Sequence, residues 1–463
     1  MRIAFIEVGN GRRFDVFKEF TIFRLGAPLL ATILHERGYK VRVFVEDIGG
    51  VDWKWVRSAD IICVSTLTST APRAYKIVKE LRESGISVIM GGVHPTFLPE
   101  ESLRFCDYVV RGEADETLPM LIDLLESKGK VYPIDIPGVS YMNNLGQTIN
   151  NPLLPDHFVD LDELPAPDFE LIYNQKNIPI YPLSTSRGCP FNCSFCSVVP
   201  MFGHKYRFRS VEKTVSDIKG IPPNAKIFFV DDNIGGNKAR LRELCRWIGI
   251  VGTGRKWSAQ VRTDVAKEPG LMAAMKEAGC TTLYVGLESI NPSSLIEGNK
   301  KQKREDIVNF LEEAERNKIN VHGMFVVGFD SDARDEAKKI AKFAREHGSI
   351  GTIQIMVLTP LPGTPFYEEM VKEKRIIHKE WKFYNGHRVV FTPKNTSVSR
   401  LQTDTLKGML SFYNLSYLLK GLKRGWRENN WFYALKVWPY AQVALRTNIM
   451  EARRYLKDIN KQS

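Results

Sequence analysis

Three cysteines lie close together in the chain, within the segment SRGCPFNCSFCS at residues 186–197: Cys189, Cys193 and Cys196. Thiolates at positions i, i+4 and i+7 of one short loop can converge on a single metal cluster. Iron–sulfur cubanes are normally held by four cysteine thiolates, and no fourth cysteine lies nearby in the sequence. The segment therefore predicts a [4Fe–4S] cluster with one iron left open, as a catalytic metal site keeps one position for its substrate.

Two simpler interpretations of these cysteines are a structural zinc site and three unrelated thiols. Zinc needs a fourth cysteine or histidine close by, and His204 is the local candidate, eight residues after Cys196. The other four cysteines are scattered along the chain, at positions 63, 106, 245 and 280. An odd total in a long chain does not indicate a disulfide framework, so we expect a reducing cytoplasm.

Alternating strand and helix patterns surround the cysteine segment. Strands are predicted at 180–185, 226–230, 257–262, 282–286, 322–327 and 352–358, and helices near 210–219, 237–250, 269–278, 303–317 and 333–347. Six such units are too few for a closed eight-fold barrel, so the α/β pattern predicts a partial (β/α)6 barrel. Catalytic groups of such barrels lie where strands end and loops begin, and the cysteines follow the first strand.

Further polar residues and one glycine follow later strands of this barrel: Asp231, Asp232, Asn233, Arg262, Glu288 and Gly328. Carboxylates and amides at strand ends can bind a cationic amino group or a diol, and a glycine lets backbone approach a ligand closely. The alternatives are a helix cap for Asn233 and a surface ion pair for Arg262.

The first part of the chain has the pattern of a second α/β domain. Strands are predicted at 2–8, 40–45, 60–66, 88–90 and 107–111, and helices at 27–37, 71–84 and 117–127. Short apolar strands separated by helices predict a parallel, Rossmann-like sheet, which binds ligands at the carboxyl ends of its strands. Residues 131–175 are rich in Pro, Asn and Asp and are predicted to be a linker with one small hairpin.

The Cys-x3-Cys-x2-Cys spacing, with Phe195 before the third cysteine, resembles the signature of the radical S-adenosylmethionine superfamily. The resemblance implies that the three thiolates bind the cluster and that its open iron binds S-adenosylmethionine. Reduction would yield a 5′-deoxyadenosyl radical that abstracts hydrogen from substrate, with electrons from a reductant such as flavodoxin or ferredoxin. It also implies contacts to S-adenosylmethionine from Phe195, Asp231, Asp232, Asn233, Arg262, Glu288 and Gly328. Residues 176–400 would form this domain.

Residues 1–130 resemble the cobalamin-binding domain found ahead of many radical enzymes of this type. The resemblance implies a slot for the cobalamin nucleotide tail at Ser65, Leu67, Gly91 and Gly92, and the segment RGEADE at 111–116 also fits. The sequence has no Asp-x-His-x-x-Gly motif to supply cobalamin's lower ligand. Two alternatives stay open: cobalamin binds without a histidine ligand, or the domain has lost cobalamin and is a scaffold.

Residues 401–463 are predicted to form a helical C-terminal extension that is both basic and aromatic. They contain 11 Lys and Arg and 4 Asp and Glu, a net of +7 out of +12 for the whole chain. Interleaved basic and aromatic residues fit a membrane interface first and nucleic acid second, while helices that cap the barrel are the plainer alternative. We find no signal peptide and no run of about 18 apolar residues, so we expect a cytoplasmic protein with peripheral contact at the inner face of the membrane.

The whole layout resembles the subgroup that contains the anaerobic magnesium-protoporphyrin cyclase and hopanoid- and lipid-modifying enzymes. That resemblance implies a transferase or oxidoreductase acting on a large apolar substrate of lipid or tetrapyrrole type. The reaction would be hydrogen abstraction followed by methylation, carbon–carbon bond formation or cyclisation. Two rivals are a tRNA-modifying methylthiotransferase, which usually has further cysteines in its first domain, and a non-catalytic metal-cluster protein that binds nucleic acid.

Overall fold

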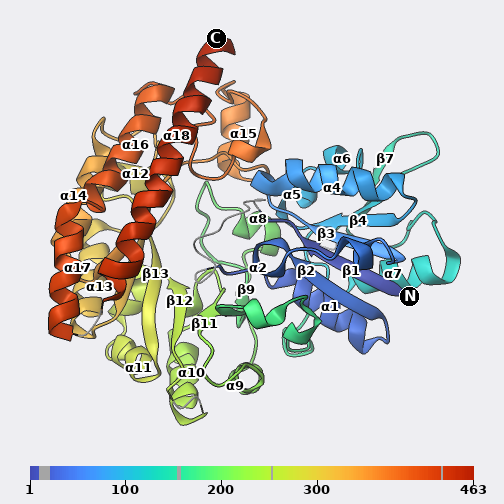
Figure 1. Ribbon diagram of the computed structural model, residues 1–463, viewed down its shortest axis with the longest axis horizontal. Helices are drawn as coiled ribbons and strands as arrows, with labels where there is room; N and C mark the ends of the chain where they lie inside the picture. Colours follow the sequence, from blue (N-terminus) through green and yellow to red (C-terminus); the bar gives the residue numbers. More distant parts are fainter. Residues whose placement is uncertain (10–20, 154–157, 252–253, 429–430, 463) are drawn as a thin grey trace. The chain divides into compact units, whose positions relative to one another are not determined.

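The computed structural model describes residues 1–9, 21–153, 158–251, 254–428 and 431–462 (Figure 1). It divides into two compact units. The first comprises Met1–Pro190 with Ser197–Asp232, and the second comprises Phe191–Cys196 with Asn233–Ser463. This division runs through the cysteine segment, because Cys189 belongs to the first unit while Cys193 and Cys196 belong to the second. Each unit is therefore described by itself.

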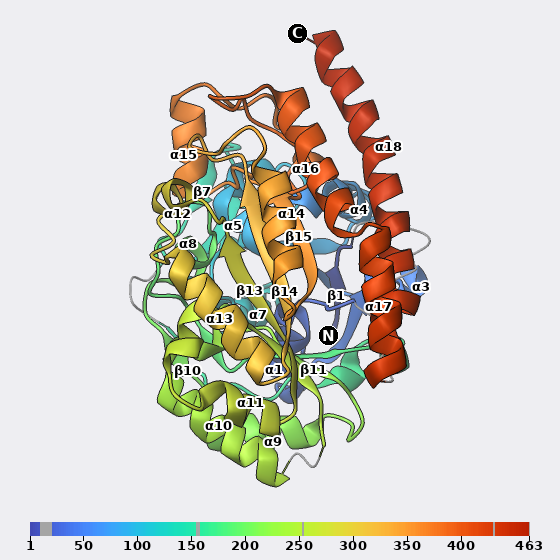
Figure 2. The same cartoon turned by 90° about the vertical axis from the view of Figure 1, so that its left-hand side faces the viewer.

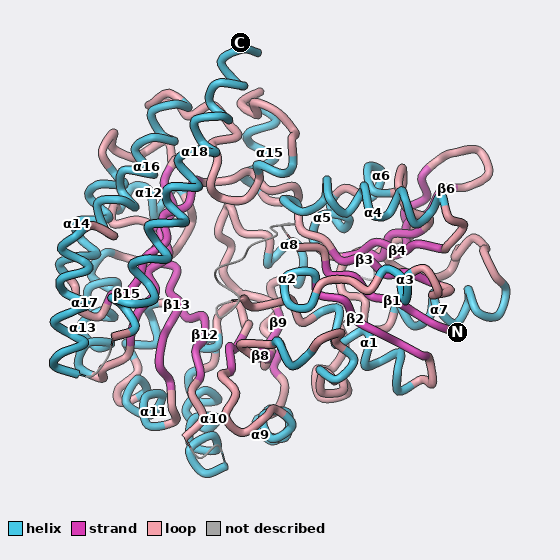
Figure 3. Tube along the Cα trace, viewed as in Figure 1, coloured by secondary structure: helices cyan, strands magenta, loops and turns pink. Residues whose placement is uncertain are grey.

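The first unit contains a seven-stranded sheet of order β2-β1-β3-β4-β5-β6-β7 (Figure 3). The parallel strands are β1 (Arg2–Glu7), β2 (Lys40–Val45), β3 (Ile61–Ser65), β4 (Ser87–Gly91) and β5 (Tyr108–Val110). They confirm the predicted Rossmann-like sheet. The hairpin expected within 131–175 forms β6 (Val139–Met142) and β7 (Thr148–Asn150), which extend the sheet in antiparallel fashion. The sheet is therefore mixed rather than purely parallel.

Helices cover both faces of this sheet, which explains why its strands are almost continuously apolar. On β1, Ile3 and Phe5 pack with helices α1 (Gly26–Glu36) and α7 (Thr117–Lys128). The intervening Ala4 and Ile6 pack with helix α4 (Ala71–Glu83) on the other face. Because side chains alternate along a strand, β1 contributes to two separate hydrophobic cores, one on each face of the sheet. The short helices α2 (Glu46–Gly49), α3 (Trp53–Val56), α5 (Val93–Phe97) and α6 (Pro99–Ser102) lie in the connections.

A second sheet has six strands in the order β15-β14-β13-β12-β11-β8. Its strands are β8 (Tyr181–Leu183), β11 (Ile227–Phe229), β12 (Trp257–Val261), β13 (Cys280–Glu288), β14 (Asn320–Val327) and β15 (Ile350–Val357). The pairings recorded within each unit are parallel. The first strand β8 and the last strand β15 stand at opposite edges, so the sheet is open. The predicted partial barrel of six βα units is confirmed.

Helices alternate with these strands as predicted: α9 (Val211–Gly220), α10 (Lys238–Val251), α11 (Leu271–Glu277), α13 (Arg304–Arg316) and α14 (Glu336–Glu346). The short helices α8 (Val198–Phe202), α12 (Pro292–Glu297) and α15 (Pro365–Lys372) were not predicted from the sequence, and neither were α2, α3, α5 and α6. The C-terminal extension is helical, as expected, with α16 (Val398–Phe412), α17 (Leu415–Glu428), a π-helical turn η8 (Tyr433–Val437) and α18 (Trp438–Gln462). Helix α16 packs beside α14 and β15 (Figure 2). No helix in the described ranges is long and apolar enough to cross a bilayer.

The C-terminal helices supply partners for the open edge of the second sheet. The hydroxyl of Tyr413 donates to Ile353 O at 2.8 Å and accepts from Ile353 N at 2.9 Å. The hydroxyl of Tyr417 donates to Gly351 O at 2.7 Å. Unpaired groups on an edge strand are costly when buried and prone to pair with other chains when exposed. The extension therefore supplies hydrogen-bond partners for Gly351 and Ile353 at the outer edge of β15.

Replacing Tyr413 with Phe tests this edge contact. The substitution keeps the ring but leaves the N–H and C=O of Ile353 without their partner in a buried place, so we expect a loss of about 1–3 kcal/mol of stability. Thermal unfolding followed by circular dichroism measures the loss. Tyr132→Phe is the matched control, because that hydroxyl bonds Asn144 at the surface. Equal shifts in the two variants would contradict the proposed role of Tyr413.

Candidate functional site

A short antiparallel pair of strands, with two residues in each strand, closes the base of the cysteine loop. Strand β9 (Ser186–Arg187) pairs antiparallel with β10 (Arg207–Phe208), so that Arg187 stands opposite Arg207. Within the loop, Cys189 N donates to Gly203 O at 3.3 Å. Gly188 has a φ of +85°, and a Cβ there would lie 2.2 Å from Lys205 O. Only glycine fits this turn, which follows β9 and starts the loop. The sequence predicted one strand at 180–185 before the loop, whereas β8 ends at Leu183 and the short β9 comes between.

Asp231 supports the strand end from which the cysteine loop departs. Its buried carboxylate accepts hydrogen bonds from Thr185 N at 3.1 Å, from Thr185 Oγ1 at 3.0 Å and from Ser186 Oγ. The neighbouring Asp232 is exposed. Desolvation by surrounding atoms, together with the charge of Asp231, nevertheless raises the pKa of Asp232 to about 7. Of the two adjacent carboxylates, one holds the loop and the other is accessible to a ligand.

Two acidic residues in the loop after β5 neutralise the facing arginines at the hairpin. Arg187 donates to both oxygens of Asp115, at 2.6 and 3.0 Å, and to Glu113 Oε2 at 2.9 Å. Arg207 donates to Glu113 Oε2 at 3.0 Å. Burial alone would lower the pKa of Arg187, but the charges and hydrogen bonds of Asp115 and Glu113 outweigh burial and raise it. We call these four residues the ion-pair clamp; within the first unit it ties the base of the cysteine loop to the loop after β5.

Hydrogen bonds from two other loops hold the part of the cysteine segment that belongs to the second unit. Ser194 N donates to Gly298 O at 3.2 Å, and Phe366 N donates to Ser194 O at 2.9 Å. The side-chain amide of Asn299 donates to Asn192 O at 2.6 Å. Backbone groups between Cys193 and Cys196 are thus fixed by the segments that follow α12 and precede α15.

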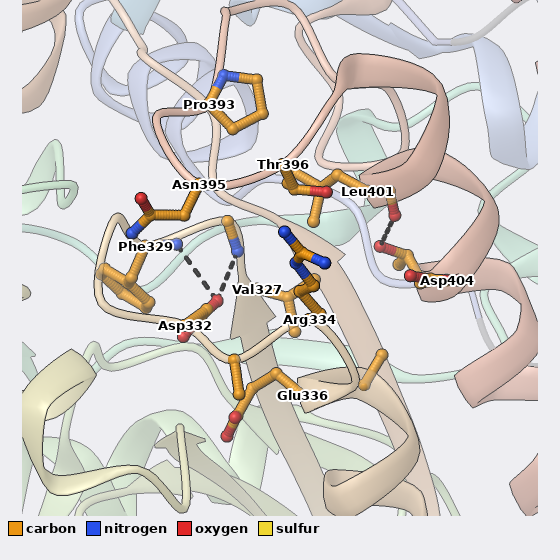
Figure 4. Close-up of a pocket in the computed structure, with 14 residues that line it drawn as sticks. Val327, Phe329, Asp332, Arg334, Glu336, Pro393, Asn395, Thr396, Leu401 and Asp404 are labelled. Carbon is orange, nitrogen blue, oxygen red and sulfur yellow. Dashed lines mark hydrogen bonds between the residues drawn. The ribbon is translucent and has the colours of Figure 1, made fainter.

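Phe195 packs edge-on against Phe329, with ring centroids 6.0 Å apart. Gly298 leaves room for this pair, because a Cβ there would lie 3.1 Å from Phe195 Cε1. Phe329 follows Gly328 at the end of β14, and both backbone N–H groups donate to Asp332, at 2.7 and 3.1 Å (Figure 4). Burial raises the pKa of Asp332 to about 7. Two predicted site residues, Phe195 and Gly328, are thereby brought into one neighbourhood.

Three other predicted residues, Asn233, Arg262 and Glu288, belong to one hydrogen-bonded chain: Arg262 bonds Asn233 directly and is connected to Glu288 through Lys300. Arg262 N donates to Asn233 Oδ1 at 3.2 Å, and its guanidinium donates to Lys300 O at 2.5 Å. The same guanidinium lies 3.7 Å from the ring centroid of Phe191, in the cysteine segment. Lys300 Nζ donates to Glu288 Oε1 at 2.6 Å, and both side chains are largely buried. Arg262 is therefore not in a simple surface ion pair.

The residues predicted to line a cobalamin slot meet at the carboxyl ends of β3 and β4. Ser65 and Gly91 are register partners in the sheet. Gly92 has a φ of +97°, and a Cβ there would lie 2.7 Å from Thr66 O. Leu67 is partly exposed beside them. Small residues at this sheet edge fit the close approach of a large ligand.

The loop cysteines differ from the other thiols of the chain in accessibility. Cys189, Cys193 and Cys196 are half-buried, whereas Cys63, Cys106, Cys245 and Cys280 are buried. Desolvation raises the pKa of all four buried thiols, that of Cys245 to about 12. Among the described residues, no three His, Cys, Asp or Glu side chains are gathered as the ligands of one metal ion would be. The donor chemistry of the loop fits a thiolate-held iron–sulfur cluster.

The less buried face of strands β13–β15 carries a polar cluster. In register across the sheet stand Tyr284, His322 and Thr352. His322 Nδ1 lies 2.7 Å from Thr352 Oγ1, and its ring lies 4.8 Å from that of Tyr284. Burial lowers the pKa of His322 to about 4, so the imidazole is neutral near pH 7. Met324 and Met356 are half-buried on the same face.

The ion-pair clamp, Lys300 and Phe191 were not predicted from the sequence. The acidic segment 111–116 and the two arginines at 187 and 207 carry complementary charge, which is a usable signal. Their pairing depends on a hairpin of only two residues per strand, which no periodicity reveals. Nothing in the sequence distinguishes Lys300 from the neighbouring lysines 301 and 303.

Two protein-family models match separate parts of the chain. The model of the radical SAM superfamily matches residues 183–344, and the model of the B12 binding domain matches residues 19–122. An uncharacterized methyltransferase of Pyrococcus horikoshii is 33% identical over 412 residues, which cover 84% of this chain and 87% of the relative. The bacteriochlorophyllide d C-12(1)-methyltransferase of Chlorobaculum tepidum is 27% identical and covers 81% of this chain and 78% of the relative.

More distant relatives include the two types of enzyme that the sequence resembled. The anaerobic magnesium-protoporphyrin IX monomethyl ester cyclase of Cereibacter sphaeroides is 26% identical, covering 78% of this chain and 60% of the relative. The hopanoid C-2 methylase of Rhodopseudomonas palustris is 24% identical, covering 77% and 65%. Both predicted resemblances are confirmed.

Among solved structures, the fold matches OxsB, a cobalamin-dependent S-adenosylmethionine radical enzyme solved with aqua-cobalamin bound. The TM-score is 0.71 at 18% identity, and the match covers 100% of this chain and 75% of that chain. At this identity the match establishes a common fold. It agrees with a Rossmann-like sheet, a partial barrel and C-terminal helices in one chain.

The variant Asp115→Asn tests the ion-pair clamp. Removing one partner of a buried pair leaves an uncompensated charge, so we expect a loss of about 3 kcal/mol, seen as a lower unfolding midpoint. Iron retained after anaerobic reconstitution should fall as well, because the loop base is no longer held. Asp335→Asn is the control, since it removes an exposed ion pair with Lys339, and such surface pairs contribute little to stability. A stable Asp115→Asn variant with full iron content would refute the role of the clamp.

His322 should make stability depend on pH. Between its unfolded pKa of about 6.5 and its folded pKa of about 4, only the unfolded chain takes up the proton. Stability is therefore lost as pH falls through this window, by up to about 3 kcal/mol, and the loss is complete below about pH 4. Unfolding midpoints at pH 7.5 and 4.5 should differ less in His322→Gln than in the parent. The control His35→Gln, at an exposed position, should retain the parental difference.

Proposed function

Since the chain belongs to the radical S-adenosylmethionine superfamily, and within it to the group with a B12-binding domain, we propose that it methylates a large apolar substrate of tetrapyrrole or lipid type. The observation that carries the proposal is the joining of both modules in one chain. In the first unit, the ion-pair clamp ties the base of the cysteine loop to the loop after β5 of the cobalamin-type sheet. Methyl transfer needs both modules, whereas carbon–carbon coupling or cyclisation does not need cobalamin.

The relatives support methylation and the substrate class. Two of those reported above are named methyltransferases and one is named a methylase. The bacteriochlorophyllide and hopanoid in their names are large and mainly apolar. The face carrying Tyr284, Met324 and Met356 offers aromatic and thioether contacts that suit such molecules.

The cofactors of the family are a [4Fe–4S] cluster, S-adenosylmethionine and cobalamin. We propose Cys189, Cys193 and Cys196 as the cluster ligands, and Ser65, Leu67, Gly91 and Gly92 as contacts to cobalamin. For S-adenosylmethionine we propose Phe195, Asp231, Asp232, Asn233, Arg262, Glu288 and Gly328. When bound, these cofactors supply radical initiation and the methyl group.

The chain's own residues hold the cysteine loop in place and orient the side chains proposed to contact S-adenosylmethionine. Asp231 fixes the strand end before the cysteines, which leaves Asp232 as the accessible carboxylate for an amino group. Lys300 holds one oxygen of Glu288, so that this carboxylate presents a fixed face to a vicinal diol. Arg262 presses against Phe191 and thereby limits the movement of the segment between Cys189 and Cys193.

The remaining assignments are also proposals. We place the cobalamin-binding domain at 1–130, a linker at 131–175 whose hairpin β6–β7 extends the first sheet, the radical domain at 176–400 and the basic aromatic region at 401–463. Flavodoxin or ferredoxin would supply electrons, and the protein would work in the cytoplasm, in lipid or pigment biosynthesis. A methylthiotransferase is less favoured, because Cys63 and Cys106 are buried in the first unit and cannot hold a second cluster without unfolding it.

Anaerobic reconstitution tests this function. We expect about four irons per chain and bound cobalamin, visible as separate absorbance bands. Dithionite and S-adenosylmethionine should yield 5′-deoxyadenosine, and Cys193→Ala should abolish both the iron and the product. Cys245→Ala is the control, because that thiol lies in a helix away from the loop and should not change iron content.

Substrate class is tested with S-adenosylmethionine carrying a labelled methyl group. We expect the label in tetrapyrrole or hopanoid acceptors only when cobalamin is bound. Cleavage of S-adenosylmethionine with an altered acceptor but no transferred label, with or without cobalamin, would instead indicate coupling or cyclisation.

A further inference from the structure

The outer side of helix α17 exposes an apolar stripe. Leu415, Leu419 and Trp426 stand at positions i, i+4 and i+11, which places them on one face of the helix. Their exposed fractions are 64%, 58% and 84%. Lys420 and Lys423 are exposed on the adjoining side of the same helix. Large apolar side chains so accessible to water, repeated at helical spacing, are unusual on a surface without a partner.

The following elements, η8 and α18, continue this surface. Phe432, Leu435, Val443 and Met450 are exposed on one side, with exposed Lys436, Arg446, Arg453, Arg454 and Lys457 interleaved among them. The two helices form a hairpin, because Gly421 of α17 packs closely against Ala434 and Trp438 Nε1 donates to Asn414 O at 3.3 Å (Figure 2). We call the exposed apolar residues of both elements the terminal apolar face.

Capping of the barrel does not explain this face. The opposite sides of the same helices are buried, through Tyr433, Val437, Leu445 and Tyr455 among others. Those residues, with Tyr413 and Tyr417, account for attachment to the second unit. The outer apolar side chains are 42–84% exposed, so much of their apolar surface is not used in that attachment.

We propose that the terminal apolar face docks on an anionic lipid bilayer, lying in its interface without crossing it. A helix with an apolar face flanked by lysines and arginines buries the apolar side chains at the headgroup boundary while the cations contact anionic lipids. The net charge of +7 over residues 401–463 matches such a surface. Docking on a bilayer does not depend on the proposed function. The reason for docking rests on that function, since the bilayer would hold the apolar substrate.

Two other partners fit the face less well. RNA binding draws on aromatic stacking and phosphate contacts and gains nothing from exposed Leu415, Leu419, Leu435 and Val443. In a symmetric dimer each partner presents the same patch, so this basic face would meet itself and like charges would be opposed. A bilayer satisfies both the aliphatic and the cationic residues at once.

Vesicle co-sedimentation of the full chain tests the proposal. We expect binding to phosphatidylglycerol-rich vesicles at low salt, and much weaker binding to phosphatidylcholine vesicles. The double variant Leu419→Glu with Leu435→Glu should bind at least about tenfold more weakly, because it places two charges where apolar contact is needed. The triple variant Lys420→Gln, Lys423→Gln and Lys436→Gln should lose about 100-fold, at roughly fivefold per lysine.

Matched controls alter equally exposed residues elsewhere. Leu145→Glu with Ile296→Glu changes two apolar side chains that are each 79% exposed, and Lys79, Lys338 and Lys342→Gln removes three lysines of other helices. Both controls should bind vesicles like the parent.

All variants should form 5′-deoxyadenosine normally in detergent, which separates failure of docking from failure of the proposed function. Equal binding by the Leu419/Leu435 variant and its control would overturn the proposal. Binding of RNA in the absence of vesicles would also overturn it. A third contradicting result would be that the parent forms a dimer and that, among the variants, only the Leu419/Leu435 variant is monomeric.

Discussion

The ion-pair clamp is the interaction on which the rest of the first unit's site depends. Two arginines stand opposite each other on a hairpin that has only two residues in each strand, an arrangement that repels itself unless anions intervene. Asp115 binds Arg187 through two parallel bonds, and Glu113 bridges both arginines. The four charges sum to zero, which limits the cost of burying them, and every one of them is needed for that balance. Such a cluster adds little net stability compared with apolar packing, but it selects one position for the loop base.

The cysteine loop needs this external support because it has almost no core of its own. Apart from Phe191 and Phe195 its residues are small or polar, and the backbone between Cys193 and Cys196 is held by Gly298 and Phe366 rather than by regular structure. In the second unit, Arg262 covers Phe191 and Phe329 packs against Phe195. Every one of these contacts comes from a segment that follows a strand of the parallel sheet. The sheet therefore shapes the loop through its carboxyl ends, where such folds place their ligands.

Periodicity predicted the strands and longer helices to within a few residues, because burial on two faces leaves a strong signal. It failed where pairing is decided by tertiary contacts: β6 and β7 were expected as a linker hairpin, but they join the first sheet at β5. Helices α12 and α15 were overlooked although Asn291-Pro292 and Thr364-Pro365 are good start signals, since both are short. The candidate residues were found by motif. The sequence could not show that the Asp231 carboxylate accepts hydrogen bonds from Thr185 and Ser186, while Asp232 stays accessible.

The two sides of the C-terminal helices have different roles. Inward, Tyr413 and Tyr417 complete the edge of β15, so these helices cannot leave without exposing unpaired backbone. Outward, Trp426 and Leu435 remain in water, at a hydrophobic cost that grows with each exposed side chain. A large apolar substrate partitions into bilayers for the same physical reason. An enzyme that places its own apolar face in that phase meets the substrate where it is concentrated, so the exposed residues and the apolar substrate follow from one constraint.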